Sequence, residues 1–157
     1  MESEIYEGLK LKNQLCFPLY ACAKEMSRRY KPYLDKLDLT YTQYIAMMVI
    51  WEKKQINVRD LGEQLYLDSG TLTPLLKKLE SKGYITRERS KEDERSLNIS
   101  ISEKGEKLKE KAVIVPQRVG SCISLEPDKA IALYKTLYEL LDNLTKNNTK
   151  NNQNFEL

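Results

Sequence analysis

The stretch that most constrains the fold is residues 57–102, where two helical patterns joined by a tight turn are followed by two alternating patterns. In the second helical pattern, four leucines recur at i, i+3, i+4 and i+7 and define a stripe that faces a core: Leu72, Leu75, Leu76 and Leu79. The opposite side carries small, polar or basic residues, namely Gly70, Pro74, Lys77 and Ser81, flanked by Thr73 and Lys78. Such a face suits a DNA major groove, although many solvated helix faces have the same composition.

The residues after this helix favour the DNA-binding interpretation. Gly83 is expected just beyond the helix end, and residues 85–89 then alternate with the period of a strand. Residues 91–96, five of them charged, predict an exposed turn, and residues 97–101 alternate on the way back. A two-stranded hairpin is marginal alone, so it must lie against the helices. The stretch predicts a winged helix-turn-helix, in a chain that is mainly α with a small β wing.

The expected DNA contacts come from the second helix, called the recognition helix below, and from the wing tip. Arg95 at the tip would reach the neighbouring minor groove, and Asp93 could hold its guanidinium group through a bidentate pair. The complete predicted DNA-binding set is Ser69, Gly70, Thr71, Thr73, Pro74, Lys77, Lys78, Asp93 and Arg95.

A family resemblance rests on the same residues. The run from Asp68 to Glu80, DSGTLTPLLKKLE, followed by Gly83, Ile85, Thr86, Arg87 and a tip with Asp93-Glu-Arg95, closely resembles the MarR family of bacterial transcription regulators. More narrowly, the chain is similar to the organic-hydroperoxide sensors of the OhrR group over residues 9–144. The resemblance implies a homodimeric DNA-binding repressor rather than an enzyme. A twofold pair of recognition helices would bind a pseudo-palindromic operator in double-stranded DNA.

Length and composition set outer limits. The 157 residues suit one domain, and a net charge of +3 with a pI near 8.6 permits nucleic-acid binding without requiring it. The amino-terminal residues 1–12 carry three glutamates and no apolar core, and no later run is long enough for a membrane span, so we expect a cytoplasmic protein. The chain has no histidine, and its three cysteines have no zinc spacing. We therefore expect no metal and no cofactor.

The single MarR-type domain should contain a helical dimerisation region, a DNA-binding region and a tail. Residues 9–37 and 103–146 are assigned to dimerisation, 40–102 to the winged helix-turn-helix, and the asparagine-rich residues 147–157 to a disordered tail. In the last helix, opened by Pro127, apolar residues alternate four and three apart and need a partner: Ala130, Tyr134, Leu137, Leu141 and Leu144. The natural partners are the 9–37 helix and a second chain.

The other helix limits follow from capping residues and prolines. Thr40 with Gln43 forms a capping-box pattern, and Asn57 can cap the next helix. The first long helix, in residues 9–37, should become regular near Asn13, which places Pro18 close to its first turn. The helix capped by Ser102 should run through Ile114 until Pro116 kinks or breaks it, and Gly62 should allow close helix packing.

Cys16 is the candidate for redox chemistry. Most buried cysteines are inert, so the position of Cys16 in a helical pattern does not by itself indicate a reactive thiol. The resemblance does, because the OhrR group has its peroxide-sensing cysteine in the setting Asn-Gln-Leu-Cys-Phe found at residues 13–17, with tyrosines that match Tyr30 and Tyr41. Cys16 and Tyr30 are 14 residues apart, roughly 21 Å along a continuous helix, so a contact between them requires the partner chain. Two phenolic donors would favour the thiolate, and interface packing is the alternative role of these tyrosines.

Cys122 extends the redox hypothesis. Some members of the OhrR group have a second, resolving cysteine after the kinked fifth helix, and Cys122 follows Pro116 at the corresponding place. The resemblance implies that organic hydroperoxide oxidises Cys16 and that Cys122 of the partner subunit then forms a disulfide with it. A buried Cys122 without chemistry is the equal alternative.

Two other functions stay open. A MarR-type repressor could respond to a small phenolic ligand, with Cys16 incidental. A thiol peroxidase could turn over peroxide at Cys16, but no cysteine lies in a thioredoxin-like strand pattern, and a recognition helix with a wing would be superfluous in an enzyme.

Overall fold

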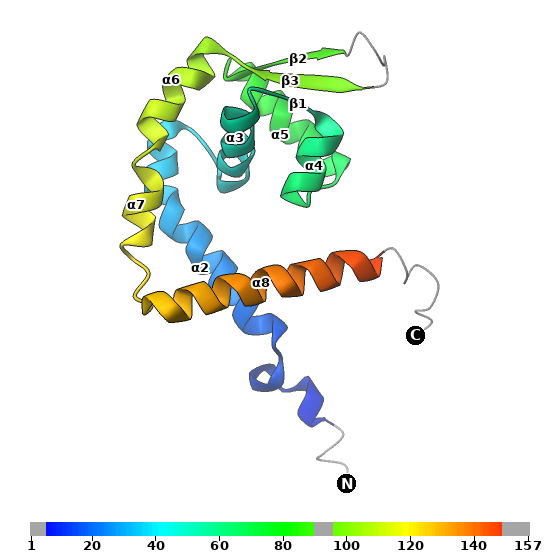
Figure 1. Ribbon diagram of the computed structural model, residues 1–157, viewed down its shortest axis with the longest axis vertical. Helices are drawn as coiled ribbons and strands as arrows, with labels where there is room; N and C mark the ends of the chain where they lie inside the picture. Colours follow the sequence, from blue (N-terminus) through cyan, green and yellow to red (C-terminus); the bar gives the residue numbers. More distant parts are fainter. Residues whose placement is uncertain (1–5, 90–95, 149–157) are drawn as a thin grey trace. The chain divides into compact units, whose positions relative to one another are not determined.

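We describe a computed structural model of the chain over residues 6–89 and 96–148 (Figure 1). The chain divides into two compact units, Met1–Gly120 and Ser121–Leu157, and each is described by itself. The elements of the first unit are η1 (Glu7–Leu9), η2 (Leu11–Asn13), α2 (Cys16–Leu34), η3 (Asp35–Leu37), α3 (Tyr41–Lys53), β1 (Gln55–Asn57), α4 (Val58–Leu65), α5 (Ser69–Ser81), β2 (Ile85–Arg89), β3 (Leu97–Ile101), α6 (Glu103–Ala112) and α7 (Val115–Gly120). The second unit contains α8 (Pro127–Asn148). The mainly α fold with a small β wing is confirmed.

Capping side chains set the starts of the central helices. The predicted caps at Thr40, Asn57 and Ser102 are confirmed, since each side chain accepts a backbone N–H from the first turn of its helix. Thr40 and Gln43 form the complete capping box. Asp68, which the sequence analysis did not identify as a cap, does the same for α5.

The recognition helix α5 follows its leucine pattern. All four leucines of the stripe are buried in the core that α3, α4 and the sheet also line. Gly83 has a φ of +75° and ends the helix as predicted. The Gly83 N–H donates to the Glu80 carbonyl at 2.8 Å and the Tyr84 N–H donates to the Leu79 carbonyl at 3.0 Å, which is a Schellman motif.

The wing belongs to a three-stranded antiparallel sheet with the order β1-β3-β2. The hairpin of β2 and β3 is confirmed, with Arg87 opposite Ile99. The sequence analysis missed β1, in which Ile56 pairs with Ile99 from the other side. β1 covers only three residues, which is too few to show the alternating pattern of a strand. It forms because its backbone pairs with β3.

Glycines allow close packing at two places in the first unit. A Cβ at Gly62 would lie 2.8 Å from the Leu67 carbonyl oxygen, which confirms the predicted close approach. A Cβ at Gly105 would lie only 2.2 Å from the Tyr84 carbonyl oxygen. The Gly105 carbonyl also accepts a hydrogen bond from Trp51 Nε1 at 2.8 Å, which joins α3 to α6.

The long helices differ from their predicted limits where prolines and short turns intervene. The segment that begins at residue 9 is not one helix, because two 3-10 turns precede α2, which starts at Cys16 rather than near Asn13. Pro18 lies in the first turn of α2, as predicted. α6 ends at Ala112 rather than continuing through Ile114, because Pro116 has no N–H to donate to the Ala112 carbonyl.

In the second unit, Pro127 is the first residue of α8, as predicted. The helix continues through Asn148 and so includes the first two residues of the predicted tail, and residues 149–157 lie outside the described residues. Its large apolar side chains are exposed, including Ile131, Tyr134, Leu137 and Leu144. Among the helices described, none is both long and apolar enough to span a membrane.

Candidate functional site

The outer face of α5 brings together the predicted DNA-binding residues that the structure describes. Exposed side chains or backbone occur at Ser69, Gly70, Thr71, Thr73, Pro74, Lys77 and Lys78. Neither Lys77 nor Lys78 has an ion pair with any residue in the described ranges, so both ammonium groups are available to an anionic partner. Asp93 and Arg95 lie outside the described residues.

Hydrogen bonds organise the start of this face. The Thr71 backbone N–H donates to Asp68 Oδ1 at 2.9 Å and the Thr71 hydroxyl donates to Asp68 Oδ2 at 3.1 Å. These bonds stabilise the carboxylate and lower the pKa of Asp68 from its ordinary value. The Thr73 hydroxyl donates to the Ser69 carbonyl at 2.8 Å, so its oxygen remains as an acceptor on the face.

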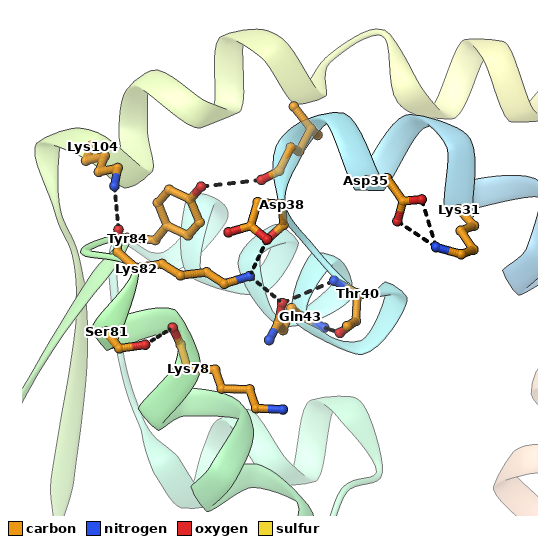
Figure 2. A network of polar contacts seen from close by, with 11 residues as sticks. Lys31, Asp35, Asp38, Thr40, Gln43, Lys78, Ser81, Lys82, Tyr84 and Lys104 are labelled. Carbon is orange, nitrogen blue, oxygen red and sulfur yellow. Dashed lines mark hydrogen bonds and ion pairs between the residues drawn. The ribbon is translucent and has the colours of Figure 1, made fainter.

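The carboxyl-terminal end of α5 is fastened to the junction between α2 and α3 (Figure 2). Lys82 Nζ lies 3.1 Å from Asp38 Oδ1 and 3.5 Å from Gln43 Oε1, and it also donates to the Asp38 carbonyl. The Tyr84 hydroxyl donates to the Leu37 carbonyl at 3.3 Å. Sequence reasoning missed these contacts, because residues 38 and 82 are brought together only by tertiary folding. They fix the orientation of α5 relative to the end of α2.

The predicted redox residues fall in separate places. Cys16 is exposed at the first position of α2. The structure brings Tyr30 and Tyr41 together, with ring centroids 4.9 Å apart. Because α2 is continuous from Cys16 to Leu34, Cys16 and Tyr30 are roughly 21 Å apart along it and do not touch within one chain.

Tyr44 joins the tyrosine pair, with its ring centroid 5.9 Å from that of Tyr30. Burial, and then the neighbouring Tyr41, raise the pKa of Tyr30, so its phenol stays protonated and can donate. The sequence analysis missed Tyr44, although it lies one turn after Tyr41 on the same helix. Cys122 is exposed in the second unit, between α7 and α8, and Cys22 is exposed on α2.

Comparisons with known proteins identify the family. A family model described as transcriptional regulator SarA/Rot matches residues 28–112, which is more than half of the chain. The organic hydroperoxide resistance transcriptional regulator of Bacillus subtilis is 59% identical over 111 residues, covering 71% of this chain and 76% of the relative. The chain is a MarR-type transcriptional regulator of the SarA/Rot family.

Solved structures agree with this assignment. Reduced AbfR bound to DNA superposes with a TM-score of 0.73 and 34% identity, covering 88% of this regulator and 98% of that chain. The disulfide form of AbfR superposes with a TM-score of 0.61 and 33% identity, covering 90% and 99%. This MarR-type regulator therefore binds DNA and has a winged-helix fold.

Proposed function

We propose that this regulator is a cytoplasmic homodimeric repressor that holds a pseudo-palindromic operator with α5 and the wing and releases it when an organic hydroperoxide oxidises Cys16. The observation that carries the proposal is Cys16 itself, exposed at the start of α2 in a chain 59% identical to an organic hydroperoxide resistance regulator. AbfR has been solved in reduced, overoxidised and disulfide forms, which supports redox control of such a fold.

A second copy of the chain is supported by apolar surface that needs cover. Leu15, Phe17 and Tyr20 are exposed around the start of α2, and α8 exposes three large residues of its heptad-like pattern, Tyr134, Leu137 and Leu144. Burial of each such side chain contributes about 1.5–3 kcal/mol, which favours association of the two sets in a dimer.

The tyrosine pair supports a role for the partner chain at the sulfur. Tyr30 and Tyr41 form one cluster, and Cys16 lies too far along α2 to reach the cluster of its own chain. In the dimer, Tyr30 and Tyr41 of one chain would donate to the Cys16 sulfur of the other and favour the thiolate. Oxidation to sulfenic acid replaces that acceptor and loosens the contact between subunits.

The decisive experiment is a gel-shift titration of the reduced protein with organic hydroperoxide, hydrogen peroxide and a phenolic acid. We expect organic hydroperoxide to release the operator at near-stoichiometric amounts, and Cys16→Ser to keep the operator bound at the same dose. Release by the phenolic acid in both wild type and Cys16→Ser would instead identify a ligand-responsive repressor. Catalytic consumption of peroxide with a thiol reductant would identify a peroxidase.

A second prediction tests the DNA contacts. Lys77→Ala and Arg95→Ala should each weaken operator binding by about 1–3 kcal/mol if the side chain contacts a base, because a groove contact or a minor-groove anchor is lost. The control is Lys109→Ala on the exposed side of α6, which should leave affinity unchanged. Equal affinity and an equal salt slope for Lys77→Ala, Arg95→Ala and the control would contradict the assignment.

A further inference from the structure

A hollow of about 260 Å³ lies beside the recognition helix, between the start of α3 and the flank of α5. Its lining combines hydroxyl, amide, ammonium and apolar groups from Thr40, Thr42, Gln43, Thr71, Pro74, Leu75 and Lys78. None of the α3 residues belongs to the predicted DNA-binding set.

Gln43 gives the hollow a donor that is otherwise unused. Its side chain is only 3% exposed, and its Oε1 accepts the Thr40 backbone N–H at 3.1 Å. That bond fixes Nε2 as the other amide atom, and Figure 2 shows it pointing away from the contacts that Oε1 makes. No residue in the described ranges accepts a hydrogen bond from Nε2. Gln43 lines the hollow and its Nε2 keeps contact with solvent, so this donor is available to an acceptor placed in the hollow.

The surroundings of Gln43 Nε2 favour an anion. At the start of α3, the Thr40 hydroxyl accepts the Gln43 N–H, and the N–H groups of Tyr41 and Thr42 have no partner among the residues described. Together with the dipole of the 13-residue helix, these groups make the site locally positive. Lys78 adds an ammonium group, which forms no ion pair within the described part of the chain.

We propose that the hollow receives one backbone phosphate of the operator, held by Lys78, the Gln43 amide and the amino-terminal end of α3. Thr71, Pro74 and Lys78 lie at i, i+3 and i+7 on α5 and mark the flank that faces α3. A helix in the major groove has its flanks beside the sugar-phosphate backbones, so this flank meets phosphates rather than bases. The inference rests on the proposed placement of α5 in the groove.

Operator duplexes with a neutral methylphosphonate at one phosphate at a time test the proposal. Wild type should lose about tenfold in affinity at one phosphate per half-site, the expected cost of a charge-assisted contact. Lys78→Gln should bind unmodified operator about tenfold more weakly and have a salt slope lower by about 1 per protomer. A methylphosphonate at that phosphate should not weaken the binding of Lys78→Gln further. The binding of Gln43→Met should likewise be no weaker with the methylphosphonate than without it. If Gln43→Met does not fold, the result with Lys78→Gln tests the proposal.

Lys77→Gln is the matched control, since it changes the neighbouring lysine on the same helix. It should weaken binding yet keep the wild-type response at the flanking phosphate. If Lys78→Gln responds to every methylphosphonate as wild type does while Lys77→Gln still weakens binding, the phosphate site is wrong and α5 remains in the groove. If neither lysine nor any phosphate matters, the placement of α5 fails as well.

Inorganic phosphate distinguishes a free anion from the DNA backbone. At constant ionic strength, phosphate should displace the operator no better than chloride and should not raise the melting temperature of the DNA-free protein. Specific stabilisation by phosphate that Lys78→Gln abolishes, without any methylphosphonate effect, would assign the hollow to a free anion and overturn the proposal.

Discussion

Stoichiometric cumene hydroperoxide is expected to join two subunits through a disulfide between Cys16 and Cys122 of the partner subunit. The Cys16 thiol attacks the peroxide and gives sulfenic acid and the alcohol, with the O–O bond broken and the sulfur oxidised. The Cys122 thiol then attacks that sulfur, forms the S–S bond and releases water. Both thiols are exposed, as these two reaction steps require. The bridge would move the recognition helices away from the half-site spacing.

Non-reducing electrophoresis measures this reaction. The covalent dimer should form in wild type and in Cys22→Ser, and it should be absent in Cys16→Ser and Cys122→Ser. Cys22 lies 6 residues, about 1.7 turns, from Cys16 on α2, so it points away from the reacting sulfur. A covalent dimer that persists in Cys122→Ser would show that Cys122 is not the resolving residue.

Gly105→Ala is expected to lower the free energy of unfolding by about 3 kcal/mol, the upper end of the usual cost of overpacking. The new methyl group would lie 2.2 Å from the Tyr84 carbonyl oxygen and 2.6 Å from Ile101 Cδ1. α6 would have to move away from β3, and the hydrogen bond from Trp51 to the Gly105 carbonyl would lengthen. Urea unfolding followed by circular dichroism measures the loss.

Gly120→Ala is the control for this prediction. It also replaces a helical glycine by alanine, but a Cβ at Gly120 meets nothing within 4 Å. Its stability should therefore equal or slightly exceed that of wild type, because alanine favours the helix. Equal unfolding midpoints for the two variants would refute the packing argument.

The parts of the fold that were predictable from sequence are those with a strong local signal. The leucine stripe of α5 and the αL position of Gly83 require only neighbouring residues, and the structure has both. The caps at Thr40, Asn57 and Ser102 are equally local. The exposed face of α5 followed from the same periodicity, which explains why the predicted groove residues are found together.

The missed features depend on contacts between distant parts of the chain. β1 is too short to show a period and forms because β3 pairs with it. Lys82 contacts Asp38, which is 44 residues away in the sequence. From the sequence alone, each would be expected to be a charged surface residue without a partner. Gln43 was recognisable as a capping-box residue, but its burial beside α5 was not. Whether Cys16 meets Cys122 depends on a second chain, so the residues of one chain cannot determine it.

The hydrogen bond between Trp51 and Gly105 has an optical consequence. The chain has one tryptophan, Trp51, and ten tyrosines. Trp51 is buried where α3 meets α6. Its indole fluorescence therefore comes from one environment, the core of the first unit, with the Tyr44 ring 6.3 Å away as an energy donor. A red shift of emission would mark the entry of water between α3 and α6. α8 contains no tryptophan, so changes around it would leave the emission unaltered unless they reach that core. Excitation at wavelengths that tryptophan absorbs and tyrosine does not therefore reports loss of the DNA-binding core and not events at the carboxyl-terminal helix.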